Sequence, residues 1–354
     1  MRSSPISLNR LMLIWVVVLI GSLLVSCQQS STGQGLADKA AAEVEAGNLD
    51  QAIQDYTQAI SQDPKNATIY QARGYTYLLN NALNQALEDF NRAIALDPEY
   101  AMAYNNRGYV YKAQNQLDKA LADYNQALQL EPKQADIYSN RGSIYLLQNE
   151  IDKALADFNT AIELDPNYVK AYNNRAYTYQ LMNDYDQALA DYSKAIELDP
   201  KDLVAYTNRA YAYLLQNDLD KALADYSKVI ELDPENASAY KFRGDIYQSQ
   251  NELVKALADY NKAIELDPKN AKAYNNRGNL YKQQNNLVSA LDDYNQALEL
   301  DPNDAYFYFN RGLIYQLQND PSKAIADFQK VLEVGEDADL LKNAQTKLEE
   351  LGAK

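Results

Sequence analysis

Apolar positions recur along this chain with a fixed period of 34 residues, which prolines mark from Pro64 to Pro302 without an insertion or a deletion. When each period is numbered from 1 to 34, large residues, mostly aromatic, occupy positions 4, 11 and 24, and small residues occupy positions 8, 20 and 27. Positions 4, 8 and 11 share one face of a helix, as do positions 20, 24 and 27. The pattern therefore predicts two amphipathic helices in every period, and a period of this length indicates a repeat architecture.

Residues that interrupt helices stand at two fixed positions in each repeat. Position 15 is Gly47 in the first repeat and asparagine in the others, from Asn81 to Asn319. Both residue types tolerate the left-handed backbone that ends many helices. An acidic residue before proline closes the second helix in most repeats, because the residue before proline disfavours the α conformation. We therefore expect a helix hairpin that turns near position 15 and closes near position 31.

The repeat from Ala101 to Gln134 resembles the tetratricopeptide repeat, a helix–turn–helix unit of 34 residues. The resemblance covers residues 35–338 and implies an all-α fold, an α-α superhelical solenoid of nine repeats. These repeats start near residues 33, 67, 101, 135, 169, 203, 237, 271 and 305. We expect the tyrosines at positions 4, 11 and 24 to form its core. The matching residues of the repeat are Tyr104, Gly108, Tyr111, Ala120, Tyr124 and Ala127.

The segment 339–354 follows the last repeat and carries one apolar stripe on a polar background. The end of a helical stack needs such an element, because the last repeat would otherwise expose its apolar face. We therefore predict a C-terminal capping helix over 339–354. The stripe consists of Leu340, Leu341, Ala344, Leu348 and Leu351.

The N-terminus has the features of a secretory signal. Arg2 and Arg10 precede an apolar run over residues 11–25, which is shorter than the roughly 20 residues that span a bilayer comfortably. The tetrad Leu24-Val25-Ser26-Cys27 resembles the lipobox of bacterial lipoproteins. The resemblance implies a signal peptide over 1–26, lipidation of Cys27 and a flexible tether over 27–34.

Two questions about the membrane stay open at this point. The apolar run could instead be an uncleaved signal anchor, which would make the chain a membrane-anchored assembly factor facing the cytosol. If Cys27 is lipidated, the mature chain lies outside the cytoplasm at the bacterial cell envelope. Gln28 then favours the outer membrane over the inner membrane, because in some bacteria an aspartate at this place retains a lipoprotein in the inner membrane.

Composition excludes several classes of function. Histidine is absent and Cys27 is the only cysteine, which removes histidine bases, Cys/His metal sites and an internal disulfide. No motif of a nucleotide-binding loop, a serine hydrolase or a zinc protease occurs. The formal net charge of −16 disfavours binding to nucleic acid. We therefore expect neither an enzyme nor a cofactor.

Arginine at position 7 and aspartate at position 23 recur together through the repeats, and either of two pairings is open. The two positions stand at about the same height within one hairpin, but the aspartate could also reach the arginine of the next repeat. A structural ion pair is the expectation, because every guanidinium has a carboxylate available. The alternative is an arginine row that binds anions or takes part in catalysis. The central pairs are Arg107 with Asp123, Arg141 with Asp157, and Arg175 with Asp191.

In tetratricopeptide proteins, ligands lie in a concave groove that the first helices line at positions 2, 5, 9, 12 and 13. The corresponding residues here are apolar in repeats two to six and polar or cationic in repeats seven and eight. An exposed row of this kind suits a peptide with an apolar segment and an acidic end. The candidate groove residues are Tyr75, Leu78, Leu79, Tyr109, Lys112, Leu146, Leu147, Tyr177, Leu181, Tyr211, Leu214, Leu215, Lys241, Lys272, Asn275, Asn279 and Lys282.

The resemblance thus implies a protein-interaction scaffold that holds peptide or protein partners of unknown identity while a lipid anchor tethers it to a membrane. A homo-oligomer is an alternative occupant of the groove. One tetratricopeptide subclass clamps the terminal carboxylate of a peptide. Lys241 and Asn276 match that clamp, but Asp245, Tyr306 and Asn310 depart from it, so we do not expect a clamp there.

Overall fold

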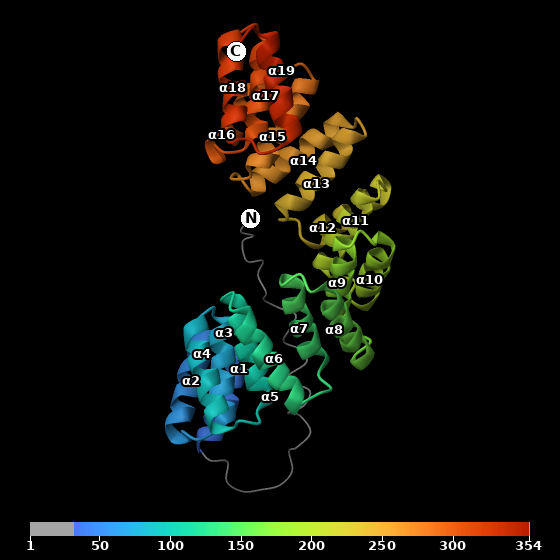
Figure 1. Ribbon diagram of the computed structural model, residues 1–354. Helices are drawn as coiled ribbons and strands as arrows, with labels where there is room; N and C mark the ends of the chain where they lie inside the picture. The colour runs from blue at the N-terminus through green and yellow to red at the C-terminus, as the bar shows by residue number, and fades with distance from the viewer. Residues whose placement is uncertain (1–31, 354) are drawn as a thin grey trace. The chain divides into compact units, whose positions relative to one another are not determined.

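The computed structural model describes residues 32–353, and every regular element in this range is a helix (Figure 1). The first helices of the repeats are α1 (Thr32–Glu45), α3 (Ala67–Leu79), α5 (Ala101–Ala113), α7 (Ala135–Leu147), α9 (Val169–Leu181), α11 (Leu203–Leu215), α13 (Ala237–Ser249), α15 (Ala271–Gln283) and α17 (Ala305–Leu317). The second helices are α2 (Leu49–Gln62), α4 (Leu83–Leu96), α6 (Leu117–Leu130), α8 (Ile151–Leu164), α10 (Tyr185–Leu198), α12 (Leu219–Leu232), α14 (Leu253–Leu266), α16 (Leu287–Leu300) and α18 (Pro321–Val334). The last helix is α19 (Ala338–Glu350).

The described residues fall into two compact parts, an N-terminal part that ends at Asn174 and a C-terminal part that begins at Arg175. Within each part, the two helices of a repeat pack as a hairpin, and successive hairpins stack in chain order (Figure 1). The fold is therefore the all-α repeat solenoid that the sequence predicts.

The residue at position 15, Gly47 in the first repeat and asparagine in the others, ends the first helix in a left-handed conformation. Asn115 has φ of 59°, and the other asparagines at this position have φ between 56° and 61°. The next amide then folds back onto the helix, since Gln116 N donates to the carbonyl oxygen of Tyr111 over 2.8 Å. The predicted turn at position 15 is confirmed.

The core of each repeat is the aromatic ring at position 24 between two small residues. Tyr124 is fully buried, and so are Ala120 and Ala127 on the same helix face. A Cβ atom placed on Gly108 would lie 2.9 Å from Cε1 of Tyr124, which is closer than van der Waals contact allows. The glycine at position 8 therefore lets the first helix approach the ring directly.

Apart from Tyr172, which is buried, the tyrosines at positions 4 and 11 are only partly buried. Tyr104 and Tyr111 are half-buried and pack against the edge of this core. Their ring centroids lie 5.4 and 5.8 Å from Cζ of Arg107, so the two rings flank the guanidinium. The prediction that all three aromatic positions form the core is right for position 24 and needs correction for positions 4 and 11, which also cover the arginine.

Both ends of the described chain differ from the regular repeats. Helix α1 already begins at Thr32, so the last three residues of the predicted tether are helical, and the rest of the tether, Cys27 and the signal segment lie outside the described residues. At the other end, Leu340, Ala344 and Leu348 of α19 are buried against Phe328 of the last repeat. A helix thus covers the end of the stack. Within residues 32–353, no helix combines the length and the apolar content that a membrane span requires.

Candidate binding groove

The arginine at position 7 forms a two-bond ion pair with the aspartate of its own repeat. Arg107 donates from Nε to Oδ2 of Asp123 over 2.8 Å and from Nη2 to Oδ1 over 2.7 Å. The pairing therefore lies within the repeat. The same geometry joins Arg73 to Asp89, Arg141 to Asp157, Arg175 to Asp191, Arg209 to Asp225, Arg243 to Asp259, Arg277 to Asp293, and Arg311 to Asp327.

A third donor of the same guanidinium reaches the preceding repeat. Nη1 of Arg107 donates to Oδ1 of Asn91 over 2.8 Å, and Nη1 of Arg141 donates to Oδ1 of Asn125 over 2.8 Å. The hydrogen bonds that Arg107 donates to Asp123 raise the pKa of Arg107 above its ordinary value. Because the carboxylate, a neighbouring side chain and two tyrosine rings surround it, the guanidinium is committed to the structure. The alternative of an anion-binding or catalytic arginine row is therefore disfavoured.

The C-terminal part exposes a row of large apolar side chains on two adjacent first helices. We call Tyr177 and Leu181 of α9 with Tyr211 and Leu215 of α11 the apolar row. Between 43% and 51% of each of these side chains is exposed. The two helices are neighbours, because Ala176 and Ala212 belong to one buried cluster. Leu214 lies beside the row but packs on the core of α12, so it is not a free groove residue.

The N-terminal part exposes fewer of its predicted groove residues. Leu147 is 60% exposed, whereas Leu79, Tyr109 and Leu146 are half-buried. Tyr75 and Leu78 pack against the core that contains Phe90. The prediction that Tyr75 and Leu78 belong to an exposed row is therefore wrong. In this repeat, Tyr75 at position 9 and Leu78 at position 12 contribute to the packing of the hairpin.

Lys112 is half-buried near Lys170, which belongs to a polar network of the N-terminal part that the sequence did not predict. A chain of hydrogen bonds runs from Nζ of Lys170 to Asn140, from Asn140 to Asn105, and from Asn105 to Asp136, each over 3.1 Å. Burial, with a smaller effect of the nearby Lys170, lowers the pKa of Lys112 to about 8. The sequence feature that could have indicated this hydrogen-bond network is an asparagine at position 5 of one repeat, Asn105, followed by an asparagine at position 6 of the next repeat, Asn140.

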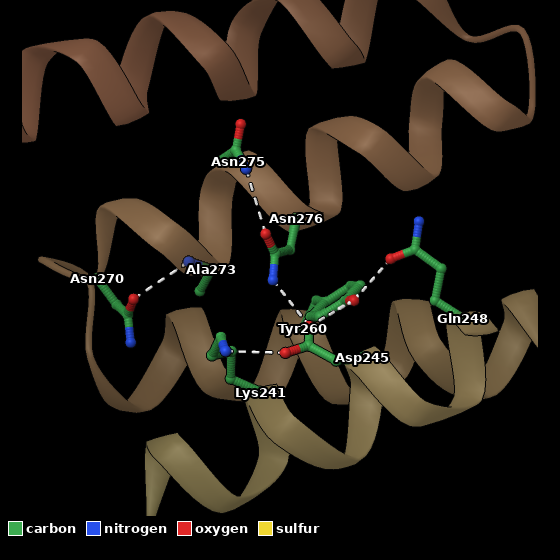
Figure 2. Close-up of polar contacts among 8 residues, drawn as sticks. All are labelled: Lys241, Asp245, Gln248, Tyr260, Asn270, Ala273, Asn275 and Asn276. Carbon is green, nitrogen blue, oxygen red and sulfur yellow. Dashed lines mark hydrogen bonds and ion pairs between the residues drawn. The ribbon is translucent and has the colours of Figure 1, made fainter. Parts of the chain in front are cut away.

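A similar network fills the groove side of the C-terminal part (Figure 2). Asp245 accepts hydrogen bonds from Nζ of Lys241, the hydroxyl of Tyr260 and Nδ2 of Asn276, each over 2.8 Å. Burial and the Asp245 carboxylate raise the pKa of Tyr260. Lys241 and Asn276 could have bound a peptide carboxylate, but both already bind the carboxylate of Asp245. This contact explains physically why no terminal-carboxylate clamp is expected here.

The other predicted polar groove residues divide into occupied and open ones. Asn275 is buried and bonds to Asn276 and Asn310, so the expectation that it faces a ligand is wrong. Asn279 accepts a hydrogen bond from the hydroxyl of Tyr294 over 2.8 Å. Lys272 is exposed, and Lys282 is half-buried beside a hollow described below. Among residues 32–353, no three acidic, cysteine or histidine side chains are placed to hold a metal ion.

Comparisons with known proteins give the same family along almost the whole repeat region. A family model described as "Tetratricopeptide repeat" matches residues 135–168, 169–202, 204–236, 271–304 and 305–337. A second model, described as "TPR repeat", matches residues 40–81, 75–115, 108–149 and 244–285. A search of curated proteins finds no match.

One solved structure with a TM-score above 0.5 shows the same fold at low sequence identity, and two further structures are similar to parts of the chain. The APC/C hetero-tetramer Cut9-Hcn1 is 17% identical over 88% of this chain and 76% of that chain, with a TM-score of 0.54. YrrB, a TPR protein with an unusual peptide-binding site, is 25% identical over 52% of this chain and 95% of its own, with a TM-score of 0.40. A tetratricopeptide repeat protein from Parabacteroides merdae is 22% identical over 79% of this chain and 98% of its own, with a TM-score of 0.48. On the family models and the repeat geometry together, the chain belongs to the tetratricopeptide repeat family.

Proposed function

We propose that this protein is a non-enzymatic scaffold that binds a peptide or protein partner along its first helices. The observation that supports the proposal is the apolar row, in which Tyr177, Leu181, Tyr211 and Leu215 expose large side chains together. Grouped apolar exposure of this kind is typical of interaction sites, whereas single exposed apolar residues are ordinary. Aromatic and leucine side chains also offer a large contact area for a partner segment.

Partner capture before and after changing the row tests this proposal. The full chain and a variant with Tyr177, Leu181, Tyr211 and Leu215 changed to serine serve as baits in the same envelope extract. A matched control changes exposed valines and a leucine of second helices to serine, at Val254, Val288 and Leu332. We expect the row variant to lose proteins that the wild type and the control retain. Identical proteins on all three baits would contradict the proposal.

We infer further that a lipid on Cys27 tethers the scaffold to a bacterial envelope membrane, outside the cytoplasm. The tetrad that ends in Cys27 and the signal-like run before it support this inference. Mass spectrometry of the N-terminal peptide from bacterial membranes tests it. A diacylglyceryl group on Cys27 as the first residue is the expected result. An intact N-terminus that begins at Met1 would support the cytosol-facing anchor instead.

A second copy of this chain is the alternative partner for the apolar row. Light scattering of the purified chain across a concentration series measures its mass. A dimer that the serine variant of the row dissociates would assign the row to a second copy of the chain rather than to another protein. We expect a monomer, because the net charge of −16 makes two copies repel each other.

A further inference from the structure

The last two repeats and the capping helix line an open, shallow hollow of about 430 Å³. Its wall is formed by Lys282 of α15, by Leu313, Gln316 and Leu317 of α17, and by Lys347 of α19. This volume lies within the range of ordinary ligand sites. The hollow therefore combines apolar side chains with two cations in a chain that is acidic overall.

Lys282 is a cation that has no countercharge within the described part of the chain. Among residues 32–353, no acidic side chain forms an ion pair with Lys282, although the chain carries many more acids than bases. Burial lowers the pKa of this lysine from its ordinary value. Withdrawing an ammonium group from water costs free energy unless a partner compensates for it. A carboxylate bound beside Lys282 would supply that compensation.

The other cation of the hollow, Lys347, already has an acidic partner within this protein. The carboxylate of Glu350 accepts a hydrogen bond from Nζ of Lys347 over 2.7 Å and one from Nε2 of Gln316 over 3.4 Å. An acidic side chain of this protein thus already satisfies Lys347, and it leaves Lys282 as the unpaired cation. An acidic side chain from a partner would match Lys282 in the same way.

Two leucines that line the hollow with Lys282 indicate that a ligand would also carry an apolar group. Leu317 is 60% exposed and Leu313 is half-buried, and both line the hollow. Burying them under an apolar side chain is favourable by roughly 25 cal/mol per Å² of apolar surface. Leu313 and Leu317 stand at positions 9 and 13 of their repeat, the same positions as the members of the apolar row.

We propose that this hollow binds a partner segment in which an acidic side chain stands next to a large apolar side chain, the acid pairing with Lys282 and the apolar group packing on Leu313 and Leu317. The inference rests on the proposed function, because it assigns a chemistry to one end of a partner that the first helices bind. An internal acidic side chain is favoured over a chain terminus, because Glu350 shows the same chemistry in place.

Fluorescence anisotropy with the full chain and a labelled peptide tests the inference. The probe is a ten-residue glycine–serine peptide with both ends blocked and one central Glu-Leu pair; comparison peptides carry Gln-Leu or Glu-Ser. We expect the wild type to bind the Glu-Leu peptide about tenfold more tightly than the Gln-Leu peptide, since one charge-assisted hydrogen bond contributes about that factor. The Glu-Ser peptide should also bind more weakly.

Two lysine variants make the test specific. Lys282→Gln should abolish the preference for Glu over Gln. Lys330→Gln, which removes the same charge from a lysine paired with Glu333 outside the hollow, should keep it. Circular dichroism checks that both variants are folded. An unchanged preference in Lys282→Gln, or no binding of the Glu-Leu peptide to the wild type, would overturn the inference.

Two further comparisons distinguish an acidic side chain from a chain terminus as the source of the carboxylate, and distinguish this inference from the scaffold proposal. A peptide with a free C-terminal carboxylate and no acidic side chain, if it bound more tightly than the Glu-Leu probe, would assign the hollow to chain termini and overturn the inference as stated. If Lys282→Gln leaves peptide binding unchanged while the serine variant of the apolar row still loses captured proteins, the hollow is wrong and the scaffold proposal stands. If neither variant changes its assay, both are wrong.

Discussion

Arg107 and Asp123 are sixteen residues apart and meet through two parallel hydrogen bonds of 2.8 and 2.7 Å. Arg107 is also sixteen residues from Asn91, its partner in the preceding repeat. One guanidinium therefore ties the two helices of its own repeat together and joins that repeat to the one before it. The ion pair is largely shielded from water, with the Asp123 side chain only 8% exposed.

Asp123→Ala should destabilise the N-terminal part strongly. Removing the carboxylate leaves a shielded guanidinium without its countercharge, which costs about 3–5 kcal/mol in comparable buried pairs. Urea unfolding followed by circular dichroism measures the loss, and hydrogen exchange shows whether α5 and α6 open first. The double variant Arg107→Leu/Asp123→Leu should be much closer to the wild type, because no charge is then left unpaired.

The matched control for this prediction is an exposed pair. Lys228 and Glu231 lie 2.6 Å apart on the surface of α12, where water screens their interaction. We expect Glu231→Ala to leave the urea midpoint unchanged. Equal effects of Asp123→Ala and Glu231→Ala would show that the repeated pair does not bear on stability.

Gly108→Ala should be less stable than Gly35→Ala by about 1–3 kcal/mol, the usual cost of overfilling a packed site. Both substitutions gain the same helix propensity, but the new Cβ at Gly108 meets the Tyr124 ring, whereas nothing lies within 4 Å of a Cβ at Gly35. Thermal unfolding of the two variants measures the difference. Repeats five and six carry Ala176 and Ala210 at this position, so a negligible difference would mean that the ring shifts without cost.

Asn115→Ala should lose about 1–2 kcal/mol, because alanine pays a steric cost at the φ of 59° that ends α5. Asn115→Gly should be nearly neutral, since glycine adopts this conformation without a Cβ clash. Urea titration of the two variants compares them directly. Equal losses would point to the asparagine side chain, rather than its backbone conformation, as the source of stability.

The Lys112 amine should titrate near pH 8 rather than near its ordinary value of 10.5. Because the folded-state pKa is lowered, the unfolded chain binds more protons between these two values, and the contribution of Lys112 to stability rises as pH increases through that window. Carbon-13 NMR of reductively methylated lysines follows the titration, with Lys112→Gln to assign the signal. A midpoint near 10.5 would show that the amine is open to water.

Much of the fold follows from the sequence because every repeat presents the same local signals. The small residues, the asparagine turn and the proline stop act within one hairpin, so their positions determine the helix ends. The tyrosines at positions 4 and 11 were harder, since periodicity puts Tyr104 and Tyr111 on the core face but does not reveal the arginine between them. The sequence predicted that the arginine at position 7 pairs with an aspartate at position 23. Whether this aspartate belongs to the same repeat or to the preceding one became clear only from the geometry of the hairpin.

The groove was predicted less well, because its exposure depends on contacts between repeats. Asn275 is buried through Asn310, which is 35 residues away, and Lys241 is held by Asp245 one helical turn later. Neither contact follows from the helical face on which a residue stands. The hollow beside Lys282 also needs a residue from the capping helix, for which the repeat pattern gives no equivalent.

The spacing of sixteen residues on either side of Arg107 has a consequence for how such a chain changes in length. If recombination removes or duplicates one 34-residue block, the arginine at the new junction still finds an aspartate sixteen residues later and the polar side chain of its new predecessor sixteen residues earlier. The arginine at the junction thus keeps its carboxylate and its link to the preceding repeat, so we expect a gene of this kind to gain or lose a whole repeat in a single step and still encode a folded protein.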